Sequence, residues 1–155
     1  MATARVWASL VGLGLLSLAT VALLLPAAAQ TPACSRTDFE TVVEDAATAL
    51  RDLNLDNKPK FQARLGELRQ KRGWTHDQFL AEAAPLVQDQ TIADYDTQSS
   101  KLLDEIQSGG QAGSTGRAPD CALLSEIRAT LKTLLGVQKA KWAYMMTKID
   151  AELAR

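Results

Sequence analysis

The sequence is poor in the residues that build metal and redox centres. It contains one histidine, His76, and two cysteines, Cys34 and Cys121, which do not form a CxxC pair. Because a protein zinc site needs three or four ligands, we expect His76 to be an exposed side chain at a helix start. GxSxG, phosphate-binding-loop, Rossmann and CxxCH motifs are also missing. The sequence therefore predicts no metal, no cofactor and no catalytic residue.

Two other patterns approach a metal site, and each lacks a ligand. Asp52, Asn54 and Asp56 resemble the opening of a calcium loop, but alanine stands at position 63, where that loop needs a bidentate glutamate. Met145 and Met146 are soft ligands for Cu(I), yet adjacent residues point about 100° apart on a helix. We expect turn-forming side chains in the first case and packing in the second.

The alternation of apolar and polar residues that is typical of strands is missing as well. Apolar residues instead recur at three- and four-residue spacing after position 30. This pattern predicts an all-α protein, a small up-and-down bundle of four to five helices with a long C-terminal helix.

The N-terminal residues follow the order of a secretory signal peptide. Arg5 precedes an apolar run over residues 6–25, Pro26 interrupts it, and three alanines follow at 27–29. The run is close to the roughly 20 residues that span a bilayer, so a retained anchor is the alternative. Pro26 and the small residues favour cleavage after Ala29. The sequence thus predicts a signal peptide over 1–29 and one periplasmic or secreted domain over 30–155.

An oxidising compartment changes what the two cysteines are expected to do. An even number of cysteines in an exported protein favours a disulfide, here Cys34–Cys121. Bridged residues have Cα atoms within about 7 Å, so the helices that follow the two cysteines would start at the same end. An up-down-up-down-up order of five helices satisfies that constraint.

Capping signals and helix breakers locate the expected helices. Thr37 and Glu40 form one predicted capping box, Thr75 and Gln78 form another, and Asp120 is the predicted N-cap of the last helix. A turn is expected at 54–57 and a flexible glycine-rich loop at 109–119. In chain order, the expected helices are 37–53, 59–72, 76–84, 91–107 and 121–154.

Charge is nearly balanced over the chain but segregated along it. The chain has 17 Lys and Arg against 18 Asp and Glu, a balance that argues against nucleic acid as a partner, as export also does. Residues 57–73 contain one acid, whereas seven acids and a single lysine follow in 75–106. The six basic residues of 57–73 are Lys58, Lys60, Arg64, Arg69, Lys71 and Arg72.

Two interpretations of this segregation are open. The basic and acidic helices neutralise each other at the surface, which their adjacency in sequence favours. Alternatively, the basic residues form an anion-facing patch for anionic lipid, polysaccharide or an acidic protein.

The second half of the last helix is the other candidate interaction surface. Aromatic residues and methionine are enriched at interface cores, and lysines flank them here. The candidate interface residues are Trp142, Tyr144, Met145, Met146, Ile149 and Leu153. A helix twice as long as its neighbours would project from the bundle and leave this stripe to a partner. Packing in the ordinary core explains the same spacing equally well.

These features predict a non-enzymatic interaction or adaptor module of the cell envelope. Its expected partners are a second copy of the chain or another envelope protein. The alternative is a carrier of a small apolar or lipid ligand between helices, and an uncharacterised enzyme comes third.

Overall fold

The computed structural model describes residues 33–155. The predicted signal peptide lies outside the described residues. In chain order, the helices are α1 (Arg36–Arg72), α2 (His76–Val87), α3 (Gln90–Thr115) and α4 (Cys121–Ala154). The predicted all-α bundle with a long C-terminal helix is confirmed. Among the described helices, none combines the length and apolar character needed to cross a membrane.

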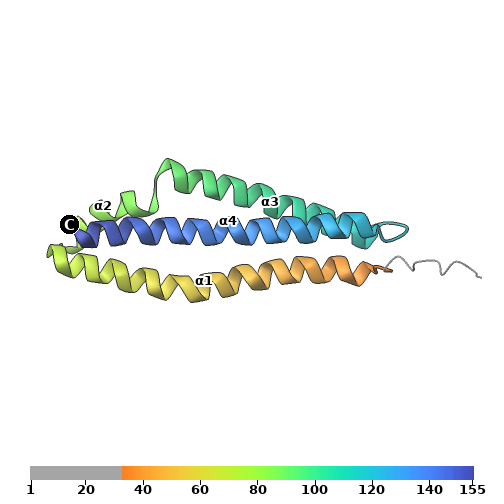
Figure 1. Cartoon of the computed structure of the whole chain (residues 1–155), viewed down its shortest axis with the longest axis horizontal. Helices are drawn as coiled ribbons and strands as arrows, with labels where there is room; N and C mark the ends of the chain where they lie inside the picture. The colour runs from red at the N-terminus through yellow and green to blue at the C-terminus, as the bar shows by residue number, and fades with distance from the viewer. Residues whose placement is uncertain (1–32) are drawn as a thin grey trace, which may run out of the picture. The chain divides into compact units, whose positions relative to one another are not determined.

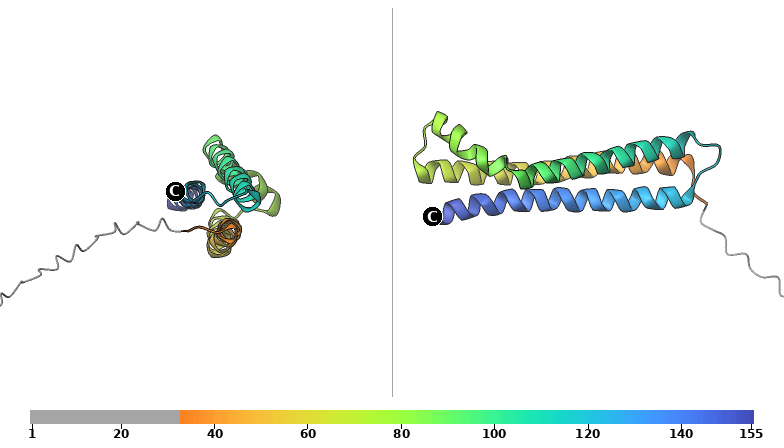
Figure 2. Two further views of the ribbon diagram at one scale, coloured as in Figure 1. Left: turned by 90° about the vertical axis from the view of Figure 1, so that its right-hand side faces the viewer. Right: turned by 90° about the horizontal axis from the view of Figure 1, so that it is seen from above.

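The two long helices, α1 and α4, run side by side in the same direction, while α2 and α3 together return the chain (Figures 1 and 2). The predicted Cys34–Cys121 disulfide is present, with a Cα–Cα distance of 5.5 Å. Both long helices therefore start at the same end, as predicted. The predicted five-helix alternation is wrong, because α1 replaces two of the expected helices.

The N-cap of α1 lies two residues before the predicted one. It is Ser35, and the capping box pairs Ser35 with Asp38 instead of Thr37 with Glu40. The Ser35 backbone N–H donates to the Asp38 carboxylate at 2.7 Å, and the Asp38 N–H donates to the Ser35 hydroxyl at 3.3 Å. The observed box has aspartate at its fourth position, where the sequence-based prediction relied on glutamate.

The turn predicted at 54–57 is also wrong, because α1 continues through Pro59 to Arg72. The side-chain amide of Asn57 donates to the Leu53 carbonyl at 2.8 Å, so this turn-forming residue is satisfied within the helix. Proline removes one helical hydrogen bond and crowds the preceding turn, and α1 is bent near its middle (Figure 1). The predicted end is confirmed at Gly73, which caps α1 with a φ of 63°.

The apolar residues form two clusters, one toward each end of the bundle. The first cluster joins α1, α3 and α4 and contains Phe39, Val42, Ala46, Ile106, Leu124, Ile127 and Leu134. The second cluster joins all four helices and contains Phe61, Leu68, Leu86, Ile92, Met145 and Ile149. Between Ala46 and Phe61, no α1 residue is fully buried. The bend in α1 therefore coincides with the gap between the two clusters.

The loop predicted over 109–119 is wrong, since α3 continues to Thr115. Three of its glycines are contact points between helices. A Cβ added to Gly113 would lie 2.1 Å from the Phe39 ring, one at Gly110 would lie 2.4 Å from Val43, and one at Gly109 would lie 2.8 Å from Ile127. These glycines permit close packing between helices. A glycine-rich composition alone does not distinguish such packing from a flexible loop.

Gly113→Ala should lower the free energy of unfolding by about 2 kcal/mol, because an added methyl group overlaps a fully buried ring. The matched control is Gly136→Ala on α4, where an added Cβ meets nothing within 4 Å. The control should raise the free energy of unfolding by about 1 kcal/mol, the helix propensity of alanine over glycine. Denaturant unfolding of both variants measures the difference. Equal effects of the two changes would contradict the packing role of Gly113.

The start of α2 is confirmed and its end is not. Thr75 and Gln78 form the predicted capping box. The helix continues past Pro85 to Val87, three residues beyond the predicted end. Pro85 removes the partner of the Ala81 carbonyl, but both residues are exposed, so that carbonyl is open to water. A late proline on an exposed face is therefore tolerated.

Candidate functional site

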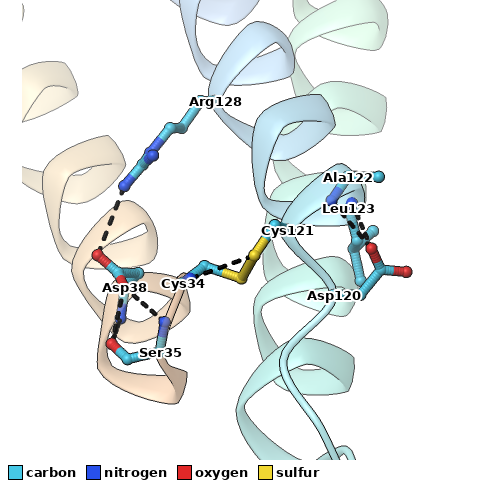
Figure 3. Close-up of a disulfide and its surroundings, with 8 residues drawn as sticks. All are labelled: Cys34, Ser35, Asp38, Asp120, Cys121, Ala122, Leu123 and Arg128. Atoms are coloured by element: carbon cyan, nitrogen blue, oxygen red, sulfur yellow. Dashed lines mark hydrogen bonds and ion pairs between the residues drawn. A yellow bond between two sulfur atoms is a disulfide. The ribbon is translucent and has the colours of Figure 1, made fainter. Parts of the chain in front are cut away.

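The disulfide end of the bundle is a structural clamp (Figure 3). The Cys34 backbone N–H donates to the Cys121 sulfur at 3.2 Å, and Asp38 lies 3.6 Å from Arg128 of α4. The predicted N-cap Asp120 is confirmed, since its carboxylate accepts from the backbone of Ala122 at 2.9 Å. Hydrogen bonds from the Ser35 side chain and backbone hold the pKa of Asp38 below its ordinary value. These contacts tie the starts of α1 and α4 together.

The candidate anion-facing residues lie on the second half of α1, and most of them contact their own chain. Arg64 lies 3.0 Å from Glu67 and 3.5 Å from Asp150 of α4. Arg72 lies 3.1 Å from Glu152, and Lys71 donates to the Leu153 carbonyl. Cations at a helix C-terminus oppose the partial negative charge of the last carbonyls. Lys71 and Arg72 therefore cap the end of α4.

The other three candidate anion-facing residues make fewer contacts with the rest of the chain. Lys60 pairs with Asp56 one turn earlier at 2.7 Å. Arg69 donates to the Trp74 carbonyl at 3.4 Å and lies 5.7 Å from the Phe79 ring centroid. Within residues 33–155, Lys58 has neither a salt bridge nor a side-chain hydrogen bond. An anion-facing role for this surface stays a prediction.

Some of these charges neutralise each other, but through a different helix from the one expected. Arg64 and Arg72 of α1 pair with Asp150 and Glu152 at the end of α4. The acids of the following segment pair with lysines of α4, as Lys141–Asp96 and Lys148–Asp89. α4 lies between the two oppositely charged segments and supplies both partners.

The junction of α2 and α3 is held by a compact polar cluster around Asp89, the N-cap of α3. Its carboxylate accepts from the Ile92 N–H at 2.8 Å, from the Tyr144 hydroxyl at 3.0 Å and from the Lys148 ammonium. Lys148 also donates to the Pro85 carbonyl. The hydrogen bond from Lys148, followed by that from the Ile92 backbone, lowers the pKa of Asp89. One carboxylate thus attaches the α2–α3 junction to α4.

Asp89→Asn should lower the Tm at neutral pH, and the difference from wild type should shrink on acidification. Because folding depresses the pKa of Asp89, its contribution is fully present above the ordinary value of 3.8 and is lost as the pH falls below it. Thermal unfolding followed by circular dichroism between about pH 3 and pH 7 tests this linkage. Asp104→Asn, at an exposed position of α3, is the control and should change the Tm little. A pH-independent difference would contradict the assignment.

The candidate interface on α4 is covered within the chain. Met145 and Ile149 are buried in the second cluster, and Trp142 lies edge-on to Phe61 with ring centroids 5.7 Å apart. Tyr144, Met146 and Leu153 are partly buried residues packed against the same cluster. The expectation that the last helix is twice as long as its neighbours is wrong, since α1 has 37 residues and α4 has 34. An interface role for this stripe stays a prediction.

The candidate metal ligands of the sequence analysis do not come together in one site. Asp52, Asn54 and Asp56 lie on the continuous helix α1 instead of a loop, and His76 is the exposed first residue of α2. In the described part of the chain, no group of three or more His, Cys, Asp or Glu is arranged to hold a metal ion.

A surface that the sequence analysis missed runs along the first half of α4. We call this surface the α4 groove; it is lined by Arg128, Leu131, Lys132, Leu135, Gly136 and Lys139. Two half-buried leucines form its apolar floor, and Gly136 leaves open space above the helix. The signal was available as apolar and basic residues at spacings of three, four and seven on one helix face.

Acidic residues of α1 lie at about the same level along the bundle, between the ion pairs Asp38–Arg128 and Arg64–Asp150. Asp45 and Asp52 are exposed on α1, and Lys132 and Lys139 are exposed on α4. None of these four appears in a salt bridge within residues 33–155, although Asp38–Arg128 and Arg64–Asp150 link the same two helices on either side. An apolar groove with unpaired cations is suited to an acidic, partly apolar helix.

Compared with known protein families, with characterised proteins and with solved structures, the chain has no match. Function is therefore inferred from its own residues. Among the surfaces described above, the α4 groove combines two half-buried leucines with two lysines, Lys132 and Lys139, that form no salt bridge within residues 33–155. Of its other lining residues, Arg128 pairs with Asp38, and Leu131 also packs against the first cluster.

Proposed function

We propose that this protein is a non-enzymatic interaction module of the cell envelope, which docks a partner along the α4 groove. The supporting observation is the groove itself, in which Leu131 and Leu135 lie beside Gly136 on an exposed helix face. A glycine inside a long helix costs about 1 kcal/mol relative to alanine. Nothing within the described chain approaches Gly136, so a partner that needs close contact would account for it.

Docking on a surface fits the packing better than an internal ligand site does. The close approaches at Gly109, Gly110 and Gly113 leave no room for another methyl group between α3 and its neighbours. The only buried polar side chain among the described residues, Ser99, accepts a hydrogen bond from Gln138 at 2.7 Å. A carrier would require these helices to separate around its ligand.

The N-terminal sequence and the disulfide support a role in the envelope. The order of Arg5, the apolar run and the alanines before position 30 is that of a cleavable signal, and the Cys34–Cys121 bridge suits an oxidising compartment. We place the mature protein in the periplasm or outside the cell.

Expression of the full chain in a bacterium, with a photo-activated crosslinking residue at position 136, tests the proposal. The matched control carries the same residue at Gly66 of α1, where an added Cβ also meets nothing within 4 Å. We expect discrete crosslinked products from position 136 only, and a mature N-terminus at Gln30 by intact mass. Equal or absent products at both positions, or a retained Met1, would count against it. Native mass spectrometry of the exported protein would reveal a retained apolar ligand if it is a carrier.

A further inference from the structure

The unpaired charges on α1 and α4 are level with one another along the bundle. The ion pairs Asp38–Arg128 and Arg64–Asp150 define the register of the two helices. Counted from either pair, Asp45 and Lys132 differ in position by at most three residues. The same holds for Asp52 and Lys139. That offset is less than one helical turn.

The middle of the two helices therefore differs from their ends. Toward the ends, acids and bases of α1 and α4 form ion pairs across the two helices at 3.1–3.6 Å. In the middle, Asp45 and Asp52 stand on one helix and Lys132 and Lys139 on the other, exposed and without salt bridges within the described chain. The bend in α1 lies in this stretch (Figure 1), and the α4 groove covers the corresponding stretch of α4.

α1 also supplies an exposed apolar residue beside these acids. Leu55 is 66 % exposed and follows Asp52 by three residues, so the two side chains are neighbours on the helix surface. Asp45, Asp52 and Leu55 together form an acidic, partly apolar ridge, which is the chemistry that the α4 groove requires.

We infer that the α4 groove binds the acidic ridge of a second copy of this chain, forming a parallel two-fold dimer. Ridge and groove are level, and Arg128 of the groove pairs with Asp38, which shares a face of α1 with Asp45 seven residues later. A two-fold axis along the helices therefore brings each ridge onto the groove of the other copy. Asp45 of each copy then faces Lys132 of the other, and Asp52 faces Lys139. This inference rests on the proposed docking function of the groove and names its partner.

Repulsion between lysines disfavours the alternative arrangement, a contact between two α4 helices. A parallel α4–α4 contact would oppose each lysine with itself, and an antiparallel contact centred near Gly136 would bring Lys132 toward Lys139. Like charges placed opposite each other disfavour such complexes. A contact between α4 and α1 pairs opposite charges in both copies.

Charge reversal in the purified, exported chain tests the dimer by sedimentation equilibrium. Lys132→Glu with Lys139→Glu, and separately Asp45→Lys with Asp52→Lys, should each weaken self-association at least about tenfold. Mixing the two double variants should restore a heterodimer, because both interfaces then carry opposite charges. The Tm of each variant should stay near that of wild type, since these residues are exposed and unpaired.

Two further variants test the close approach at the groove. Gly136→Leu should abolish self-association without lowering the Tm, because its side chain enters open space. Gly66→Leu, at the matched glycine of α1, should leave self-association intact.

Three results would overturn the inference. One is a wild-type chain that remains monomeric up to about 1 mM. Another is an Asp45→Lys, Asp52→Lys variant that dimerises normally, which would indicate an α4–α4 contact. The third is a monomeric chain whose position 136 crosslinks only to a different protein; there the docking function stands and the second-copy partner fails.

Discussion

Replacing both Cys34 and Cys121 by alanine should lower the free energy of unfolding by about 4 kcal/mol. The bridge joins residues 87 positions apart, so it removes a large part of the conformational freedom of the unfolded chain. Cys121 is exposed, so little buried surface is lost with its side chain. Urea unfolding of the double variant, and of wild type in reductant, should give the same loss.

The control for the disulfide lies at the same end of the bundle. Ser35→Ala removes the N-cap of α1 and leaves the bridge intact, and it should cost about 1 kcal/mol. A double cysteine variant that loses no more than this control would mean that the bridge adds nothing beyond the local packing and capping.

Trp142→Ala should cost about 3 kcal/mol of unfolding free energy, the lower end of the range for truncating a core aromatic. The indole packs edge-on against Phe61 at 70° between ring planes and lies against the second cluster. Thermal and denaturant unfolding of the dilute chain measure the loss. Leu80→Ala, at a position 57 % exposed on α2, is the control and should stay within about 0.5 kcal/mol of wild type.

The same variant separates the two interpretations of the aromatic stripe on α4. If Trp142 is a core residue, its loss lowers stability first, and the proposed self-association of the chains that remain folded should keep its affinity. If Trp142→Ala leaves the free energy of unfolding unchanged and weakens self-association instead, the stripe is an interface. Packing in the second cluster would then not explain its aromatic residues and methionines.

Helix boundaries show where local signals suffice. Thr75 with Gln78, Gly73 and Asp120 mark boundaries correctly, because a cap is a contact between residues at most a few positions apart. The same signals mislead at Asn54 to Pro59 and at Pro85. A continuous helix that packs at both ends tolerates one missing hydrogen bond in its middle, and sequence alone does not show what lies at those ends.

The glycines of α3 and α4 show the limit more sharply. Gly110 and Gly136 are both glycines inside helices, yet an added Cβ would lie 2.4 Å from Val43 in one case and in open space in the other. The difference depends on which helix lies opposite. The position of a glycine along the chain does not show which helix lies opposite it. The sequence therefore predicts a loop at the glycine-rich segment and does not locate the α4 groove.

The helical class, the disulfide and the common starting end of the first and last helices could be predicted from the amino-acid sequence. Each of these follows from local periodicity or from a choice with a single possible pairing. The tertiary structure adds that α1 accompanies α4 to its end, where Arg72 pairs with Glu152, and that α1 helps to cover the aromatic stripe, for which core and interface were equally open. It also decided that Asp45 and Lys132 stand level but unpaired. Such relations depend on the register between distant helices, which is set by the packing of whole helix faces and not by neighbouring residues.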